Sequence, residues 1–263
     1  MGGELVTVTS ADGTRLGVEV VGSGPPLLAV HGGTADRTRW TPLVPHLADR
    51  FTLHLLDRRG RGASTEESDG QYALEREADD VVAVCEAIGA PVRLLGHSYG
   101  GLIGMEALTR TEAIERALLY EPAFDTPGHR IAPPDAFDRL SERLAADDRE
   151  GALDLFYREI IRIDPAPLKA QPVWQARLAA VHTIEREGRI GLTYAVAPQH
   201  FAAVDVPVRI LAGTESPPAF GAAARAARDA IPGSDLVWLE GQGHTMIDAD
   251  TAGFARHVVD FLG

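Results

Sequence analysis

The chain of 263 residues is poor in cysteine, in lysine and in positive charge. Cys85 is its only cysteine, which excludes an internal disulfide, and its place among apolar residues at helical spacing predicts a core side chain. Lys169 is the only lysine, and the formal net charge is −13. This charge disfavours partners such as nucleic acids or an anionic membrane surface, and it favours solubility.

Long apolar runs and targeting signals are also missing. No apolar stretch approaches the roughly 20 residues that span a bilayer. Residues 1–10 lack the basic segment and apolar run of a signal peptide. No Cys/His pattern has the spacing of a zinc site, and no nucleotide-binding fingerprint is present. We therefore expect a cytoplasmic protein without metal or cofactor, a monomer or weak homodimer, that acts on a small molecule.

Short apolar runs alternate with helical patterns towards both ends of the chain. Asp12 and Gly13, between two segments with strand patterns, predict a hairpin. The predicted strands are residues 5–9, 15–21, 26–30, 51–56, 92–95, 116–120, 208–211 and 236–239, and the clearest predicted helices are residues 74–88, 99–109, 220–231 and the C-terminal segment. This order predicts an α/β fold with a mostly parallel sheet flanked by helices.

The middle of the chain breaks this alternation. Residues 122–203 contain helical segments and several prolines but no pattern of a buried strand. We therefore expect a core domain formed by residues 1–121 and 204–263, interrupted by a helical insertion at residues 122–203.

The sequence at residues 96–100 is Gly-His-Ser-Tyr-Gly, which fits the pattern G-x-S-x-G. A predicted strand precedes the motif and a predicted helix follows it, which is the context of a nucleophile elbow. The glycines leave room for neighbouring backbone around a strained turn. The turn lies at the carboxyl edge of the sheet, where open α/β sheets bind ligands. Ser98 is therefore the predicted nucleophile.

A second glycine-rich loop follows the predicted strand at residues 26–30 and contains Gly32 and Gly33. An acyl-transfer site needs two backbone N–H donors where the oxyanion forms. We expect one donor from Tyr99, the residue after the nucleophile, and the other from Gly33, with Gly32 close by. These three residues form the predicted oxyanion hole.

His244 follows the last predicted strand in a Gly-Gln-Gly-His segment. A serine needs an adjacent base to become a nucleophile. The loop of His244 lies at the same sheet edge as Ser98, and it follows the serine in the chain order of known triads. His244 is therefore the predicted general base, whereas the side chain of His97 is expected to point away from the site.

These motifs together resemble the α/β-hydrolase superfamily over about residues 5–121 and 204–262. The resemblance implies that residues 57–64 form the structural loop after the fourth strand. It also implies that residues 122–203 form the helical cap that shapes substrate choice. No cofactor belongs to the chemistry that the resemblance implies.

The acid of the implied triad departs from the common pattern. Most members have Asp three positions after the glycine that ends the seventh strand, but here that position after Gly213 holds Ser216, with Glu215 one residue earlier. Some members carry the acid at the end of the sixth strand, where this chain has Glu121. We favour Glu121 as the acid and keep Glu215 as the alternative.

The expected reaction is hydrolysis of an ester or lactone, or of a thioester, of an apolar small molecule through an acyl-enzyme. Ser98 stands where epoxide hydrolases and haloalkane dehalogenases have Asp, which argues against those reactions. Trp40, Trp174 and His182 are expected to contact the substrate. The alternatives are a C–C bond hydrolase, a biosynthetic cyclase or lyase in the same cavity, and a slow-turnover ligand receptor.

Overall fold

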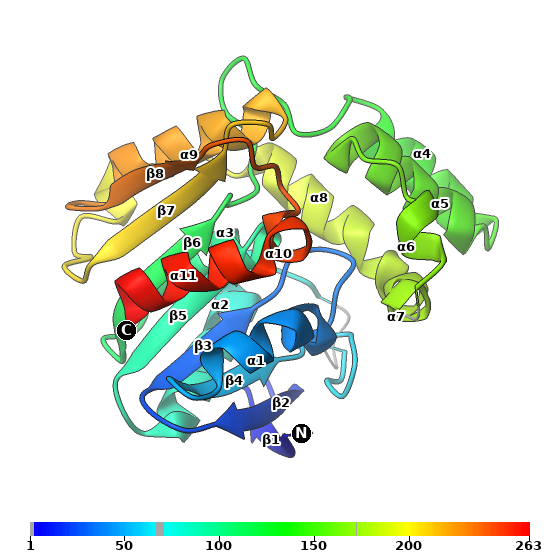
Figure 1. The fold of residues 1–263 in the computed structure, drawn as a ribbon. Helices are drawn as coiled ribbons and strands as arrows, with labels where there is room; N and C mark the ends of the chain where they lie inside the picture. The colour runs from blue at the N-terminus through cyan, green and yellow to red at the C-terminus, as the bar shows by residue number, and fades with distance from the viewer. Residues whose placement is uncertain (1–2, 67–70, 172) are drawn as a thin grey trace.

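An eight-stranded sheet runs through the centre of the computed structural model, which describes residues 3–66, 71–171 and 173–263 (Figure 1). The strand order is β1-β2-β4-β3-β5-β6-β7-β8. β2 pairs antiparallel with β1 and with β4, and all other neighbours are parallel. The strands are β1 (Glu4–Thr9), β2 (Arg15–Gly22), β3 (Pro26–Val30), β4 (Thr52–Leu56), β5 (Val92–His97), β6 (Ile114–Tyr120), β7 (Val208–Gly213) and β8 (Asp235–Leu239).

This architecture confirms the predicted fold class. Every predicted strand is present, with its ends within two residues of those predicted. The expected hairpin joins β1 to β2, and Gly13 adopts a φ of 87° there, a value that glycine reaches without steric cost.

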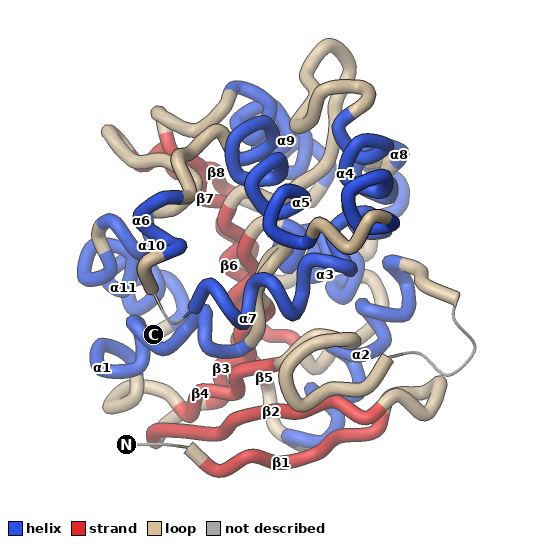
Figure 2. The backbone as a smooth tube through the Cα atoms, turned by 90° about the vertical axis from the view of Figure 1, so that its right-hand side faces the viewer, coloured by secondary structure: helices blue, strands red, loops and turns tan. Residues whose placement is uncertain are grey.

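Helices cover both faces of the sheet (Figure 2). Side chains alternate along each strand, so that Leu94 packs on one face and Leu95 on the other. The first face is covered by α2 (Leu74–Ile88), α3 (Tyr99–Leu108) and α9 (Pro218–Ala230), and the second by η1 (Arg37–Leu43), α1 (Val44–Leu47), α10 (Met246–Ala249) and α11 (Thr251–Leu262). Cys85 on α2 lies in the core of the first face as predicted, and burial raises the pKa of its thiol to about 12.

Further helices lie between β6 and β7 in the chain and gather beside the sheet edge (Figure 1). They are α4 (Ala136–Ala145), α5 (Arg149–Leu155), the π-helical turn η2 (Phe156–Ile161), α6 (Ala166–Lys169), α7 (Val173–Ala180), η3 (Val181–Thr183), α8 (Ile184–Thr193) and η4 (Pro198–His200). We call residues 122–203 the helical insertion. It has an apolar cluster of its own, which Phe220 of α9 joins from the sheet domain. Among the described helices, none has the length and apolar character needed to cross a membrane.

Candidate active site

Ser98 occupies a strained turn between β5 and α3. Its φ of 57° and ψ of −123° lie in a region that L-residues rarely adopt, at a cost of order 1–3 kcal/mol. Both glycines of the motif are required by close backbone contacts. A Cβ on Gly100 would lie 2.2 Å from the carbonyl oxygen of Val30, and one on Gly96 would lie 2.7 Å from the carbonyl oxygen of Gly100. The local sequence therefore permits a turn that places Ser98 at the carboxyl edge of the sheet.

The imidazole of His244 contacts a buried carboxylate. Its Nδ1 lies 2.5 Å from Oε2 of Glu121, which follows β6 and is fully buried. The other oxygen, Oε1, accepts hydrogen bonds from the backbone N–H of Gly213 at 2.7 Å and from Oγ of Ser216 at 2.6 Å. These donors hold the carboxylate in one orientation, because each removes rotational freedom from the same group.

Glu215 lies in a different environment from Glu121. It is exposed, and no hydrogen bond or ion pair of the described chain joins its side chain to His244. Of the two candidate acids, the structure therefore brings Glu121 to the histidine. Ser216, at the position where the resemblance implies Asp, instead donates a hydrogen bond to Glu121.

Two aromatic rings pack against the ring of His244. The ring of Phe220 stacks on it at a centroid distance of 4.1 Å, and the ring of His97 lies at 4.8 Å. Tyr120 donates a hydrogen bond to the carbonyl of Gly243, the residue before the histidine. The position of His244 is therefore set by its neighbours in β5, β6 and α9.

The expectation for His97 was wrong. Its side chain lines the same cavity as Ser98, and its Nε2 lies 3.2 Å from the carbonyl oxygen of His244. The reason is strand alternation: His97 shares a face with Leu95, and the loop that carries His244 covers the end of that face. Burial, reinforced by the neighbouring His244 and Arg39, holds the pKa of His97 well below its usual value, so this ring is neutral.

The cavity at Ser98 has two arms, and Ser98 and Gly33 line both. The first, of about 60 Å³, we call the apolar arm, because most of its wall is apolar and comes from the helical insertion and α9. The second, of about 350 Å³, we call the polar arm. The apolar arm includes Ile131, Phe137, Ile160, Ile184, Leu192 and Phe220, and the polar arm includes Arg39, His97, Tyr157, Arg177, His244 and Asp248.

The three residues that the sequence placed at the substrate lie elsewhere. Trp40 is buried in the core beside the sheet, and Trp174 is buried in the cluster of the helical insertion. The half-exposed His182 binds Glu66 at 2.9 Å on the surface. In the part of the chain that the structure describes, none of the three lines either arm, so we do not carry them into the site.

The loop after β3 lies against Ser98. A Cβ on Gly32 would lie 2.8 Å from the Cβ of Ser98, so only glycine fits there. The carbonyl of Gly32 lies 2.9 Å from Nδ1 of His31 and accepts a hydrogen bond from Nη1 of Arg58 at 3.2 Å. Because the C=O and N–H of a trans peptide point in opposite directions, these contacts turn the N–H of Gly33 away from Arg58.

The tautomer of His31 and the free N–H groups of Gly33 and Tyr99 agree with this orientation of the loop. The backbone N–H of Arg58 donates to Nε2 of His31 at 3.3 Å, which leaves the proton of the neutral ring on Nδ1, facing Gly32. Burial and the charges of Arg58 and Arg61 keep the pKa of His31 well below its usual value. Within the described residues, no hydrogen bond uses the N–H of Gly33 or of Tyr99. Both amides therefore stay available beside Ser98.

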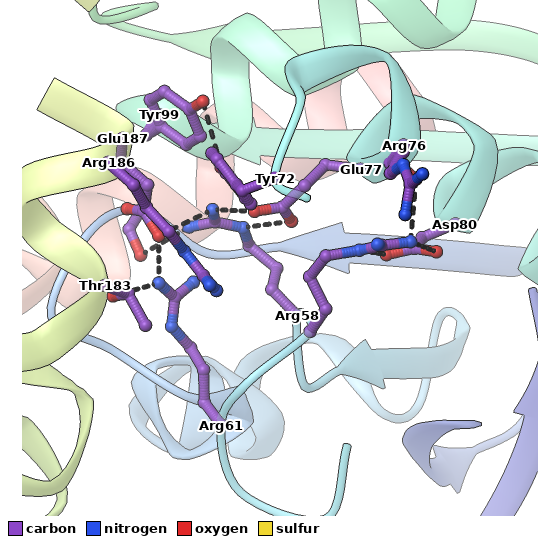
Figure 3. Close-up of polar contacts among 12 residues, drawn as sticks. Arg58, Arg61, Tyr72, Arg76, Glu77, Asp80, Tyr99, Thr183, Arg186 and Glu187 are labelled. Carbon is purple, nitrogen blue, oxygen red and sulfur yellow. Dashed lines mark hydrogen bonds and ion pairs between the residues drawn. The ribbon is translucent and has the colours of Figure 1, made fainter. Parts of the chain in front are cut away.

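The guanidinium of Arg58 is held by two buried carboxylates (Figure 3). Its Nε donates to Glu77 of α2 at 2.9 Å, and its Nη2 lies 3.1 Å from Glu187 of α8. Burial opposes ionisation of Glu77, but the charges of Arg58 and Arg61 and the hydrogen bonds from Arg58 and Tyr72 together outweigh it, and the pKa of Glu77 is lowered. Arg61 donates to Glu187 and to Thr183, so this cluster ties the loop at residues 57–64 to the helical insertion.

Sequence reasoning missed Arg58, Arg177 and Glu187 as parts of this region. Arg58 lies in the arginine-rich run at residues 57–64, which is a visible signal, although nothing in the run shows which carboxylates its members meet. Arg177 and Glu187 carry no local motif, since they are single polar positions on helices of the insertion.

Comparison with known proteins gives one family. Residues 27–257 match the model of the "Alpha/beta hydrolase family". An alpha/beta hydrolase from Sphaerobacter thermophilus has 32% identity and a TM-score of 0.84, over 98% of this chain and 100% of that chain. The esterase RhEst1 from Rhodococcus sp. ECU1013 has 26% identity and a TM-score of 0.78, over 97% of each chain.

A curated relative matches over a shorter segment. N-formylmaleamate deformylase from Pseudomonas putida is 32% identical over 114 residues, which cover 43% of this chain and 42% of the relative. The chain spans at most half the length of the curated relatives it matches.

Proposed function

This chain belongs to the α/β-hydrolase family, and from that premise we propose that it is a serine hydrolase that cleaves a carboxylic ester or lactone of a small, mainly apolar molecule. The observation that carries the proposal is the contact of His244 with buried Glu121 in the cavity that Ser98 lines. The resemblance to an esterase and to a deformylase supports cleavage at a carbonyl group.

In the proposed reaction, Oγ of Ser98 attacks the carbonyl carbon and gives its proton to Nε2 of His244. Nε2 is the free nitrogen, because Nδ1 faces Glu121. The carboxylate of Glu121 stabilises the resulting imidazolium, and the N–H groups of Gly33 and Tyr99 donate to the oxyanion. Collapse of the tetrahedral intermediate breaks the bond to the alcohol oxygen, which takes the proton from His244.

Water then completes the cycle. His244 removes a proton from a water molecule, which attacks the acyl carbon and restores Ser98 and the free acid. A thioester would follow the same steps with a thiol as the leaving group. We further propose that the helical insertion, residues 122–203, acts as a cap on a core domain of residues 1–121 and 204–263, because its residues form most of the wall of the apolar arm. A cytoplasmic monomer or weak homodimer stays a prediction.

The test is steady-state hydrolysis of short- and medium-chain p-nitrophenyl esters by the native protein, Ser98→Ala and the control Ser23→Ala. Ser23 is exposed on a loop. We expect kcat/KM to fall by roughly 10³-fold or more in Ser98→Ala, since a triad without its nucleophile loses most of its rate enhancement. Ser23→Ala should keep the native value.

A covalent probe makes the result independent of the ester chosen. A fluorophosphonate should label the native protein at Ser98 and leave Ser98→Ala unlabelled, because the probe reacts with activated serines. Ester hydrolysis at equal rates in the native protein and in Ser98→Ala, or no labelling of Ser98, would reject the proposal. The C–C hydrolase, cyclase or lyase, and receptor alternatives would then be tested.

A further inference from the structure

Arg177 on α7 is a buried cation in the wall of the polar arm. Its side chain is 8% exposed, and its only described hydrogen bonds are from Nη1 to Oη of Tyr157 at 2.5 Å and to Oγ1 of Thr34 at 3.2 Å. Both acceptors are uncharged hydroxyl groups. In the described part of the chain, no carboxylate forms an ion pair with Arg177, and its Nε has no partner.

The other charged side chains of this wall are already paired. Arg39 binds Asp248 at 2.5 Å, and Asp164 binds Arg158 at 3.1 Å. Among the charged side chains of this wall, Arg177 is therefore the one without a described ion-pair partner. A buried charge without a counter-ion is unfavourable in the free protein, and buried charges are normally paired.

The geometry of Arg177 leaves part of its guanidinium for a ligand. Nη1 is used by Tyr157 and Thr34, whereas Nη2 makes no described hydrogen bond and, unlike Nε, is not sealed from solvent. Thr34 directly follows Gly33, the residue proposed to bind the carbonyl oxygen. A group bound at Arg177 would therefore lie a short distance from the reacting carbonyl.

We propose that Arg177 binds a carboxylate of the substrate, so that the substrate is a carboxylate-bearing ester or lactone. The assignment rests on the proposed hydrolase function. A single unpaired cation matches a monoanion, whereas a phosphate group would bring nearly two charges. The guanidinium is also the side chain best suited to bind a carboxylate.

The apolar arm receives the uncharged part of the substrate. The charged groups in its wall are Asp125 and Glu187, of which Glu187 is already paired with Arg58 and Arg61. No cation lines this arm within the described residues, so it offers no counter-charge to an anion. The charged end of the substrate therefore lies in the polar arm and the uncharged part in the apolar arm. This placement fixes the orientation of the carbonyl group at Ser98.

The test compares esters that differ in charge but not much in size. One pair is mono-p-nitrophenyl glutarate and p-nitrophenyl hexanoate, which vary the acyl part. The other is m-carboxyphenyl acetate and m-carbamoylphenyl acetate, which vary the alcohol part. We expect the native protein to prefer the anionic member of at least one pair by tenfold or more in kcat/KM, which is a typical gain from a charge-assisted hydrogen bond.

Variants locate the preference at Arg177. In Arg177→Gln the ratio of kcat/KM for the anionic and neutral esters should fall at least tenfold, and Arg177→Lys should keep part of it, because the charge remains but the planar group is lost. The control is Arg149→Gln, which removes the same charge from an exposed part of the insertion and should keep the native ratio. An equal fall for both esters in Arg177→Gln would show a structural role only and overturn the assignment.

A binding measurement tests the role of Arg177 in the absence of catalysis. Glutarate should raise the Tm of Ser98→Ala more than glutaramide does at matched ionic strength, and Arg177→Gln should abolish the difference. Ser98-dependent hydrolysis without any charge preference would overturn the carboxylate site and leave the hydrolase proposal intact. Failure of labelling at Ser98 would instead overturn the hydrolase proposal, while the glutarate shift still decides the role of Arg177.

Discussion

The two walls of the cavity differ in how their polar groups are satisfied. On the sheet side, Glu121 contacts His244, Ser216 and the backbone of Gly213, and Arg58 is held by buried carboxylates. On the insertion side, Arg177 keeps a charge with no described counter-ion. A group with a complete set of partners is fixed in place, whereas a group without one is ready for a ligand. We therefore expect changes on the sheet side to alter kcat or folding, and changes on the insertion side to alter substrate preference.

The largest effect is expected for Glu121, whose carboxylate on the sheet side contacts three partners. Glu121→Gln keeps the size of the side chain but removes the charge that we propose stabilises the imidazolium of His244, and we expect kcat to fall on the order of 10³-fold. Glu215→Gln, at an exposed carboxylate, should stay near the native rate. The measurement is the steady-state hydrolysis of p-nitrophenyl esters. Similar losses in both variants would show that Glu121 has no special role.

The next largest effect is expected in the cluster of Arg58, Glu77 and Glu187, which connects the two walls. Arg58→Met leaves Glu77 buried without its main counter-ion, and we expect the free energy of unfolding in urea to fall by about 3 kcal/mol. The double variant Arg58→Met/Glu77→Gln should be more stable than the single variant, because the unpaired charge is gone. If the two substitutions instead destabilise the protein additively, the pair does not interact as described.

A smaller effect is expected on the insertion side. Leu192 is half-buried in the wall of the apolar arm, so Leu192→Ala should enlarge this arm and let a longer chain enter. We expect the ratio of kcat/KM for p-nitrophenyl octanoate and acetate to rise about tenfold. Leu5→Ala, at an exposed leucine of β1, is the matched control. An unchanged ratio would place the acyl chain in the other arm.

The smallest effect is expected at Asp12, which lines neither arm of the cavity, and it depends on pH. Burial opposes ionisation of Asp12, but hydrogen bonds from Thr14 and Arg59, together with the charge of Arg59, outweigh it and lower the pKa of Asp12 to about 2. Because the folded-state pKa is lowered, this stabilisation is present above the ordinary pKa of an aspartate, 3.8, and is lost as the pH falls through about 2.

Asp12→Asn should therefore reduce the free energy of unfolding by about 1 kcal/mol at neutral pH, with solvent screening included. The difference from the native protein should shrink towards zero near pH 2. The measurement is urea unfolding across this pH range, with Asp49→Asn at an exposed position as the control. A difference that does not change with pH would mean that the ionised carboxylate does not stabilise the hairpin.

The sequence predicts the sheet side much better than the insertion side, for a physical reason. Strand patterns and the glycines around Ser98 are local, because each glycine is required by backbone within the motif or on the neighbouring strand. The choice between Glu121 and Glu215 stays open in the sequence, since both follow strands at the same sheet edge. It depends on which carboxyl group reaches His244, and the one that does, Glu121, is more than a hundred residues away along the chain.

The insertion shows the opposite case. Trp174 and Arg177 lie three residues apart on α7, and only the packing of that helix decides which one faces the cavity. The aromatic side chain is buried in the cluster of the insertion, and the charged one reaches the polar arm. The direction of the His97 side chain was mispredicted for another reason. The prediction considered the turn at Ser98 and not the alternation of side chains along β5, which ends at His97.

Backbone strain is concentrated at the candidate site. Thr34, Ser98 and Glu121 are three of the five described non-glycine residues with positive φ, and each such conformation costs of order 1–3 kcal/mol. Glycine would relieve that cost at Ser98 or Thr34. A laboratory evolution campaign that selects this protein for heat resistance alone should therefore accumulate glycine at these positions, and the variants that survive longest at high temperature would be the least able to react.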